Sequence, residues 1–302
     1  MNALPKFPDF RPIELSDRPL LEGVFRAMQP EVSEFSFTNL YMFRHVHDYR
    51  VSDLNGNIAI IAKSYSGEPY CMPPIGGEKI SESIEALFSH MTSLGAKPEM
   101  SIVPKEFLDK YVAGRYEYAL DLDNCDYLYR TASLMELTGR KYHDKKNLLN
   151  RFLKSSGSVT EYRRLTPELV PEAKEMVVRW CREKCSEDVP STFGETEATL
   201  GALDSLAGLD IIGGIVLING HLEALALGEA LNDSTAVVHV EKANSQYAGL
   251  YQYISSEFLV REFSGKEFVN REQDLGEPNL RKSKMSYNPI RMIEKYKVWP
   301  KE

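Results

Sequence analysis

Cysteine is scarce in this 302-residue sequence, and long apolar runs are absent from it. The four cysteines are Cys71, Cys125, Cys181 and Cys185. Because they form no C-x-x-C pair, we expect free thiols and no zinc site built from Cys and His. The longest apolar stretch, IIGGIVLI at 211–218, is far shorter than the roughly 20 residues that cross a bilayer. The N-terminal residues do not form a signal-peptide pattern. These absences predict a soluble, cytoplasmic protein.

The common signatures of catalysis and cofactor binding are also missing. There is no Ser-His-Asp order, no phosphate-binding Walker loop and no Rossmann glycine pattern. His45 and His47 with Asp48 lack a third ligand at metal spacing, so we expect no metal and no permanently bound cofactor. The net charge of -8 makes the chain a poor general partner for nucleic acid or anionic membranes, although local basic patches can survive within it.

What is present is an ordinary globular composition, 43% hydrophobic and 26% charged, with one element order written twice. Each half reads strand, helix, helix, hairpin, strand, helix, strand, short helix, strand. The hairpins turn at Asn55-Gly56 and at Asn219-Gly220, because Asn-Gly favours the type I′ turn that matches strand twist. Coincidence is the alternative, since such hairpins are common. We predict two tandem α+β domains, 1–135 and 136–302, joined near 124–145.

Two segments carry a family resemblance that spans essentially the whole chain. GRKYHDKKNLLNRF (139–152) and NREQDLGEPNLRKSKMSYNPIRMIEKY (270–296) resemble the soluble bacterial relatives of the phosphatidylglycerol lysyltransferase C-terminal domain. The resemblance implies two tandem GNAT-type domains, as in the Fem-like aminoacyl transferases, each a mixed, mostly antiparallel sheet flanked by helices. It also implies transfer of an acyl or aminoacyl group from an activated carrier, acyl-coenzyme A or aminoacyl-tRNA.

The second of these segments combines acid, base and amide side chains around Gly276, where a core would need apolar residues. Acyl transfer needs a group that removes a proton from the acceptor and donors for the developing oxyanion. Asp274 or Glu272 is a candidate proton acceptor, Lys282 a candidate oxyanion donor, and Tyr287 a candidate proton donor to the leaving group. The alternative is a solvated ion-pair network that fixes the last strand.

A further candidate region follows the strand STAVVHVEKA (234–243). Glu241 ends this strand as a second candidate base or as a surface residue, whereas His239 is expected to be a hydrogen-bonded sheet histidine. In a GNAT-type fold the following loop and helix N-terminus offer N–H groups to a donor phosphate. An ordinary helix cap is the alternative here. The predicted donor-binding residues are Asn244, Ser245, Gln246, Tyr247, Ala248, Gly249, Arg281 and Lys284.

A basic stretch between the halves is a candidate contact for tRNA phosphates, although a solvated helix face is equally consistent with it. Its residues are Arg140, Lys141, Lys145, Lys146 and Arg151. The acidic total charge argues against tRNA, and the glycine-poor loop after Glu241 argues against coenzyme A. The sequence therefore leaves the carrier open, as it does the acceptor. A catalytically degenerate binding module, which senses a metabolite or docks a partner, is the alternative to an enzyme.

Overall fold

The computed structural model describes residues 3–184 and 190–301, and it divides into two compact units. The first unit consists of Met1–Asp126 and Ile293–Glu302, and the second of Tyr127–Met292. The predicted ranges 1–135 and 136–302 differ from these bounds for two reasons. Residues 127–135 belong to the second unit, and the last ten residues of the chain return to the first.

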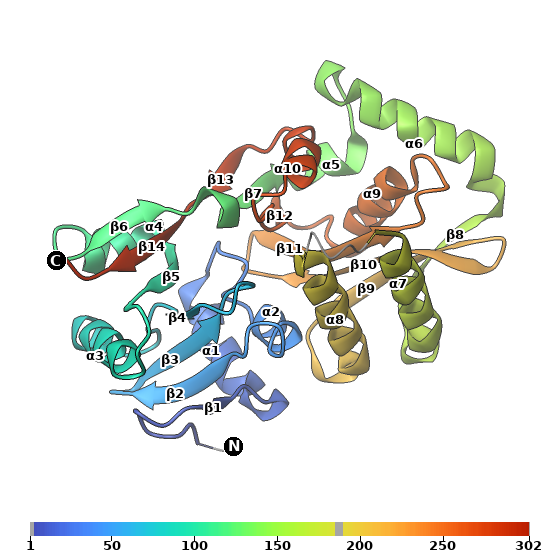
Figure 1. Ribbon diagram of the computed structural model, residues 1–302. Coiled ribbons are helices and arrows are strands. Elements are labelled where there is room, and N and C mark those ends of the chain that lie inside the picture. Colours follow the sequence, from blue (N-terminus) through green and yellow to red (C-terminus); the bar gives the residue numbers. More distant parts are fainter. Residues whose placement is uncertain (1–2, 185–189, 302) are drawn as a thin grey trace. The chain divides into compact units, whose positions relative to one another are not determined.

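The first unit is built on a seven-stranded sheet in the order β1-β2-β3-β4-β5-β14-β6 (Figure 1). Among the neighbouring strands of this sheet in the described part of the chain, only β4 and β5 pair in parallel. Its strands are β1 (Arg11–Pro12), β2 (Arg50–Leu54), β3 (Asn57–Lys63), β4 (Pro69–Cys71), β5 (Met100–Pro104), β6 (Glu117–Leu120) and β14 (Lys295–Trp299). Its helices are α1 (Arg18–Met28), α2 (Phe37–Met42), α3 (Ile80–Ser93) and α4 (Lys105–Phe107).

The C-terminal strand β14 lies between β5 and β6, which the local sequence pattern did not indicate. Its first residue, Lys295, is fully buried, and its ammonium group lies 2.5 Å from a Glu34 carboxylate oxygen and 2.6 Å from an Asp126 carboxylate oxygen. Burial alone would lower the pKa of Lys295, but the two carboxylates raise it above its ordinary value. This buried ion cluster ties β14 to segments far away in the sequence.

The second unit also has a seven-stranded sheet, in the order β13-β7-β12-β11-β10-β9-β8. Its strands are β7 (Asp126–Arg130), β8 (Thr160–Arg164), β9 (Ile212–Ile218), β10 (His221–Ala230), β11 (Thr235–Ala243), β12 (Phe268–Asn270) and β13 (Arg291–Ile293). Its helices are α5 (Thr131–Glu136), α6 (His143–Ser156), α7 (Val170–Lys184), α8 (Pro190–Asp204), α9 (Leu250–Glu262) and α10 (Pro278–Met285). Strands β11 and β12 pair in parallel, which makes the sheet mixed.

Both faces of this second sheet are covered. One face shares a hydrophobic core with α5, α6 and α9, and that core includes Val216, Ala226 and Val238. The alternate positions Ile215 and Leu227 are fully buried as well, so the opposite face is also shielded. Helix α7 packs against α8 and contacts β10 and β11. The predicted fold class, two mixed α+β sheets flanked by helices, is confirmed.

Both predicted hairpins form at their Asn-Gly pairs. β2 and β3 meet at Asn55-Gly56, where φ is 57° and 81°, and β9 and β10 meet at Asn219-Gly220, where φ is 52° and 81°. Positive φ at both central residues is what a type I′ turn requires. Among the cysteines, Cys71 and Cys125 are free and buried. The expected free thiol is wrong for Cys181, which is disulfide-bonded, while Cys185 lies outside the described residues.

Candidate active site in the second unit

Strands β11 and β12 pair over only three residues and then separate. The parallel register runs from Thr235 opposite Phe268 to Val237 opposite Asn270, whereas β11 continues to Ala243. Beyond β12 the backbone stays beside β7, with which β12 also pairs, since Arg271 N donates to Tyr127 O at 3.0 Å. The backbone pairing of the two strands therefore ends at Val237, and we call the space between β11 and the segment after β12 the gap.

A β-bulge directs Glu241 towards this gap. Leu227 of β10 lies opposite Val240 and Gly228 lies opposite Val238, so His239 is an extra residue in β11. A bulge reverses the alternation of side chains beyond it. As a result Glu241 reaches Arg271, on the side of the core shared with α9, while Lys242 lies 3.7 Å from the Trp180 ring centroid on α7.

The gap holds a compact polar group, the Glu241 cluster, which consists of Glu241, Arg271, Tyr287, Gln252 and Lys145. A Glu241 carboxylate oxygen lies 3.0 Å from an Arg271 guanidinium nitrogen, and their side chains are only 11% and 16% exposed. Gln252 of α9 donates to the Tyr287 hydroxyl at 2.8 Å. The Lys145 ammonium of α6 lies 4.4 Å from the Tyr287 ring centroid, and the Arg271 guanidinium lies 5.2 Å from it.

The electrostatics of this cluster follow from its partial burial. Burial, and next the charge of Arg271, lowers the pKa of Lys145. Burial raises the pKa of the Tyr287 hydroxyl, while Arg271 opposes that change. Burial would lower the pKa of Arg271, but Glu241 raises it overall, so the guanidinium stays charged. The site thus combines one carboxylate and two cations around a neutral phenol.

This arrangement has the parts that acyl transfer requires. An ionised carboxylate has about four acceptor positions, so Glu241 keeps capacity for a proton while it is bonded to Arg271. Because Gln252 donates to the Tyr287 oxygen, the phenolic hydrogen is available to another acceptor. Arg271 and Lys145 supply positive charge where an oxyanion or a phosphate would lie. Glu241 and Tyr287, both predicted from the sequence, are therefore brought together.

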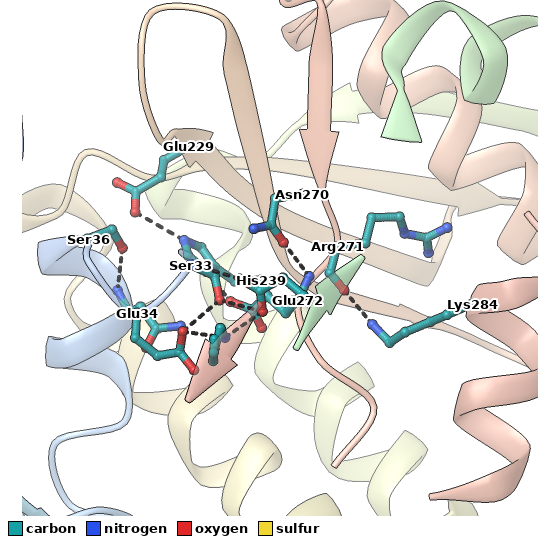
Figure 2. Close-up of polar contacts among 12 residues, drawn as sticks. Ser33, Glu34, Ser36, Glu229, His239, Asn270, Arg271, Glu272 and Lys284 are labelled. Atoms are coloured by element: carbon teal, nitrogen blue, oxygen red, sulfur yellow. Dashed lines mark hydrogen bonds and ion pairs between the residues drawn. The ribbon is translucent and has the colours of Figure 1, made fainter. Parts of the chain in front are cut away.

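Glu272 lies outside this cluster, in a second one in which the His239 side chain is fully buried and the Glu229 and Glu272 side chains are 8% and 12% exposed (Figure 2). His239 Nδ1 lies 2.8 Å from a Glu272 carboxylate oxygen, and Nε2 lies 3.1 Å from a Glu229 carboxylate oxygen. The expectation of a hydrogen-bonded sheet histidine is confirmed. Glu272 is consequently engaged by a buried imidazole rather than open to an acceptor. Lys284, predicted to bind the donor, donates to the Arg271 carbonyl oxygen and fixes the backbone there.

The charge on His239 makes the stability of the second unit depend on pH. Burial alone would lower the pKa of His239, but its bonds to Glu229 and Glu272 raise it to about 10. A pKa above its unfolded value of about 6.5 means that this stabilisation is complete below pH 6.5 and is lost as the pH rises through about 10. Between pH 7 and 10, we expect the free energy of unfolding of the wild-type protein to fall by up to about 1.4 kcal/mol per pH unit more than that of His239→Gln. Urea melts of both proteins across that range measure the difference; parallel curves would contradict it.

Asp274 is buried and fully engaged. Its carboxylate accepts from Arg281 Nε at 2.8 Å, from another Arg281 nitrogen at 2.7 Å, from Gly276 N at 2.9 Å and from the Tyr127 hydroxyl. Burial would raise the pKa of Asp274, but these donors lower it overall. A carboxylate with lowered pKa and four donors is a poor proton acceptor, so this environment favours a structural role. Arg281, predicted to bind the donor, is paired here, and Lys282 is exposed.

Substitution separates these roles. Asp274→Asn should destabilise the second unit by about 1–3 kcal/mol, because the buried Tyr127 hydroxyl and the half-exposed Arg281 guanidinium lose a charged acceptor. Lys282→Ala, only eight residues further along, removes an exposed side chain and should change stability by less than about 0.5 kcal/mol. Thermal melts of both variants test this. Equal melting temperatures would return Asp274 to the list of candidate catalytic groups.

The loop before α9 is built for packing as well as for a turn. The Asn244 side-chain oxygen accepts from Gln246 N at 2.9 Å, and its amide nitrogen donates to Glu223 at 2.9 Å. At Gly249, φ is 96°, and an added Cβ would lie 2.2 Å from the Leu148 carbonyl oxygen of α6. Helix α6 therefore lies against the N-terminus of α9 at Gly249. Of the other predicted donor-binding residues, Tyr247 is half-buried, and Ser245, Gln246 and Ala248 are exposed.

Gly249→Ala should therefore be strongly destabilising. The added methyl group would overlap the Leu148 carbonyl oxygen, and a residue other than glycine would have to keep a positive φ. Together these changes should lower the free energy of unfolding by about 2–4 kcal/mol. Gly220→Ala is the matched control: φ is 81° there, but nothing lies within 4 Å of an added Cβ. We expect a melting temperature several degrees lower for Gly249→Ala than for Gly220→Ala. Equal losses would mean that α6 does not pack on α9 in this way.

Comparison with known proteins agrees with this geometry. The profile of the family described as "Phosphatidylglycerol lysyltransferase, C-terminal" matches residues 25–299. The chain belongs to this family. Among curated proteins, an uncharacterised protein of Mycoplasmoides gallisepticum is 23% identical over 201 residues, which is 63% of this chain and 61% of that protein. The alignment thus spans less than two thirds of that relative.

Solved structures share the fold of this phosphatidylglycerol lysyltransferase-like chain. A conserved protein of unknown function from Bacteroides thetaiotaomicron VPI-5482 is 28% identical, with a TM-score of 0.87 over 97% of this chain and 99% of that one. L-PGS from Bacillus licheniformis is 13% identical, with a TM-score of 0.64 over 100% and 95%. FemX is 10% identical, with a TM-score of 0.53 over 97% and 97%. The resemblance to lysyltransferase C-terminal domains and the tandem GNAT-type, Fem-like fold is confirmed.

Sequence reasoning did not place Arg271, Gln252 or Lys145 in the Glu241 cluster, and it gave Arg271, within the 270–296 segment, no role. Gln252 lies on the buried side of α9, where a polar residue among apolar positions was a usable signal. Lys145 was expected only as a tRNA contact, and the bulge at His239 has no local sequence signature. The remaining predicted contacts on and before α6 lie at its surface: Arg140, Lys141 and Arg151 are exposed, and Lys146 donates to Glu136 O at 2.9 Å. No helix within the described ranges is long and apolar enough to cross a membrane.

Proposed function

We propose that the second unit is an aminoacyltransferase domain that moves an aminoacyl group from aminoacyl-tRNA to an amine or hydroxyl acceptor. The observation that carries this proposal is the divergence of β11 from β12 after Val237 and Asn270, with Glu241 and Arg271 facing each other across it. Membership of the lysyltransferase family supports transfer as the reaction class.

The carrier follows from charge and from packing. Residues 140–156 hold six basic residues and one acidic residue, Asp144, in a chain whose net charge is -8. Such a local basic surface suits a polyanionic carrier such as tRNA, whose affinity comes mainly from phosphate contacts. The N-terminus of α9, where a coenzyme A pyrophosphate would find free N–H groups, is approached by the α6 backbone at Gly249. Both features favour tRNA over coenzyme A.

The chemistry assigns one role to each side chain of the Glu241 cluster. The acceptor nitrogen or oxygen attacks the ester carbonyl carbon, so a new C–N or C–O bond forms and Glu241 takes the proton that the acceptor loses. Arg271 and Lys145 stabilise the negative charge on the carbonyl oxygen. When the ester C–O bond breaks, Tyr287 gives its proton to the departing ribose oxygen. Proton exchange with solvent then restores Tyr287 and Glu241.

The test is a transfer assay with three arms. Purified protein is incubated with total tRNA charged with radiolabelled amino acids, with labelled acyl-coenzyme A, or with both carriers uncharged, each with a mixture of cellular amines and lipids as acceptors. We expect protein-dependent movement of label from tRNA into a new product, weakened by added salt. Label moving only from coenzyme A would replace the carrier. No transfer in any arm, with binding retained, would favour the degenerate binding module.

A further inference from the structure

His239 occupies the point at which the two strands separate. The backbone pairing of β11 with β12 ends at Val237 opposite Asn270. His239 and Glu272 each lie two residues further along, and their side chains are joined at 2.8 Å. A side-chain bond thus continues the link between the strands beyond their backbone pairing, and the Glu241–Arg271 ion pair forms a second link across the gap.

The same imidazole also reaches the other neighbour of β11. Its Nε2 lies 3.1 Å from Glu229 of β10, so one side chain joins β10, β11 and the segment after β12 (Figure 2). The imidazole is fully buried between two carboxylates, and both ring nitrogens can donate only when the ring is protonated. The pKa of His239, raised to about 10, agrees with that state at neutral pH.

The backbone on the far side of this bond is held in an uncommon conformation. Glu272 has a φ of 54°, and its N–H donates to the Asn270 side-chain oxygen at 2.7 Å. Arg271 lies between these two residues, and Lys284 is bonded to its carbonyl oxygen. The direction in which the Arg271 side chain leaves the backbone therefore depends on a turn that the His239–Glu272 bond anchors.

We propose that His239 is a positioning residue: through Glu229 and Glu272 it fixes where β11 and β12 diverge, and thereby sets the distance between Glu241 and Arg271. As the extra residue of the bulge, it acts on both members of that pair. It lies two residues before Glu241, and its partner Glu272 directly follows Arg271. The catalytic consequence rests on the proposed function, whereas the geometric consequence does not.

The experiment uses three variants of the full chain and one control. His239→Gln and Glu272→Gln each break the carboxylate–imidazolium bond, while the double variant His239→Gln/Glu272→Gln allows an amide-to-amide bond without buried charge. Leu134→Ala, at a buried core position of α5, supplies a destabilised control that leaves the His239 and Glu272 side chains in place. The first readout is the nitrogen-15 signal of the Arg271 guanidinium, which is assigned by its loss in Arg271→Lys. The guanidinium hydrogens exchange slowly with water when Glu241 holds them.

We expect His239→Gln and Glu272→Gln to lose the slow-exchanging Arg271 signal, and the double variant to recover it in part. Leu134→Ala should keep the Arg271 signal even where its melting temperature falls as far as those of His239→Gln and Glu272→Gln. In the tRNA transfer assay the single variants should lose kcat at least tenfold with little change in KM, because the donor surface on α6 is untouched.

A retained Arg271 signal in both single variants would overturn the positioning role and leave His239 a purely structural histidine. Loss of the signal in Leu134→Ala as well would also overturn it, since general destabilisation would then explain the result. A lost signal in a chain that shows no transfer with any carrier would support the geometric inference and contradict the proposed function, so the two failures are distinguishable.

Discussion

Lys295→Ala is expected to destabilise the first unit by about 3–5 kcal/mol, the largest stability effect of any substitution considered. The Lys295 side chain is fully buried, and its removal leaves the Glu34 and Asp126 carboxylates without their cation. The Asp126 carboxylate also accepts from the backbone N–H of Ser33 at 2.9 Å, and the Glu34 and Asp126 side chains are only 7% and 0% exposed. A loss of this size should lower the melting temperature by more than about 10 °C.

Lys297→Ala is the matched control, because it lies on the same strand two residues later. The Lys297 side chain is 43% exposed, and its carboxylate neighbours are 3.7 and 3.9 Å away. Exposed ion pairs of this kind contribute about 0–1 kcal/mol. Calorimetric scans of the two variants should therefore differ by at least about 2 kcal/mol. Similar melting temperatures would show that β14 is not held by a buried cation.

Glu241→Gln is expected to reduce the rate of transfer about 10²- to 10⁴-fold, the largest effect on activity. The amide is nearly isosteric and can still accept from Arg271, but it cannot take up a proton at neutral pH. Binding of the donor should change much less, because the basic face of α6 is unaltered. Single-turnover kinetics with charged tRNA, together with a separate binding titration, measure the two quantities.

Glu223→Gln provides the control for charge loss near the same strands. Glu223 is 13% exposed, close to the 11% of Glu241, and it also faces an arginine, Arg179, at 3.6 Å. It lies on β10 and accepts from Asn244 rather than from the Glu241 cluster. We expect this variant to keep most of the wild-type rate. If Glu241→Gln kept the wild-type rate too, proton transfer to Glu241 would have no part in the reaction.

Sequence reasoning succeeded where the determinant is local. The Asn55-Gly56 and Asn219-Gly220 turns fix two hairpins because their backbone preferences are set within two residues. Helix α3 ends at Ser93, two residues before Gly95, and α9 begins at Leu250, directly after Gly249. The element order and the family-bearing segments were also sufficient for the tandem fold class.

Sequence reasoning failed where the determinant of a feature lies far away in the chain. The hydrophobic pattern of β14 shows that it is a strand, but its place between β5 and β6 depends on pairing with residues almost 200 positions earlier. Asp274 remains a candidate base by sequence, but its hydroxyl donor, Tyr127, is 147 residues distant, so its hydrogen-bonded surroundings could not be read from the polar segment. The bulge at His239 is visible only in the register with β10, and it decides that Glu241, and not Lys242, faces Arg271.

The central claim is that the gap between β11 and the segment after β12 accepts the aminoacyl end of a tRNA. Its most direct measurement is nuclear magnetic resonance of the second unit's side chains and amides in the full chain, titrated with a non-hydrolysable aminoacyl-amide analogue of the terminal CCA nucleotides. The account predicts saturable shifts at Glu241, Arg271, Tyr287 and Lys145, all of which weaken in Glu241→Gln or with added salt. Saturable binding that shifts other residues and leaves these four unchanged would contradict it.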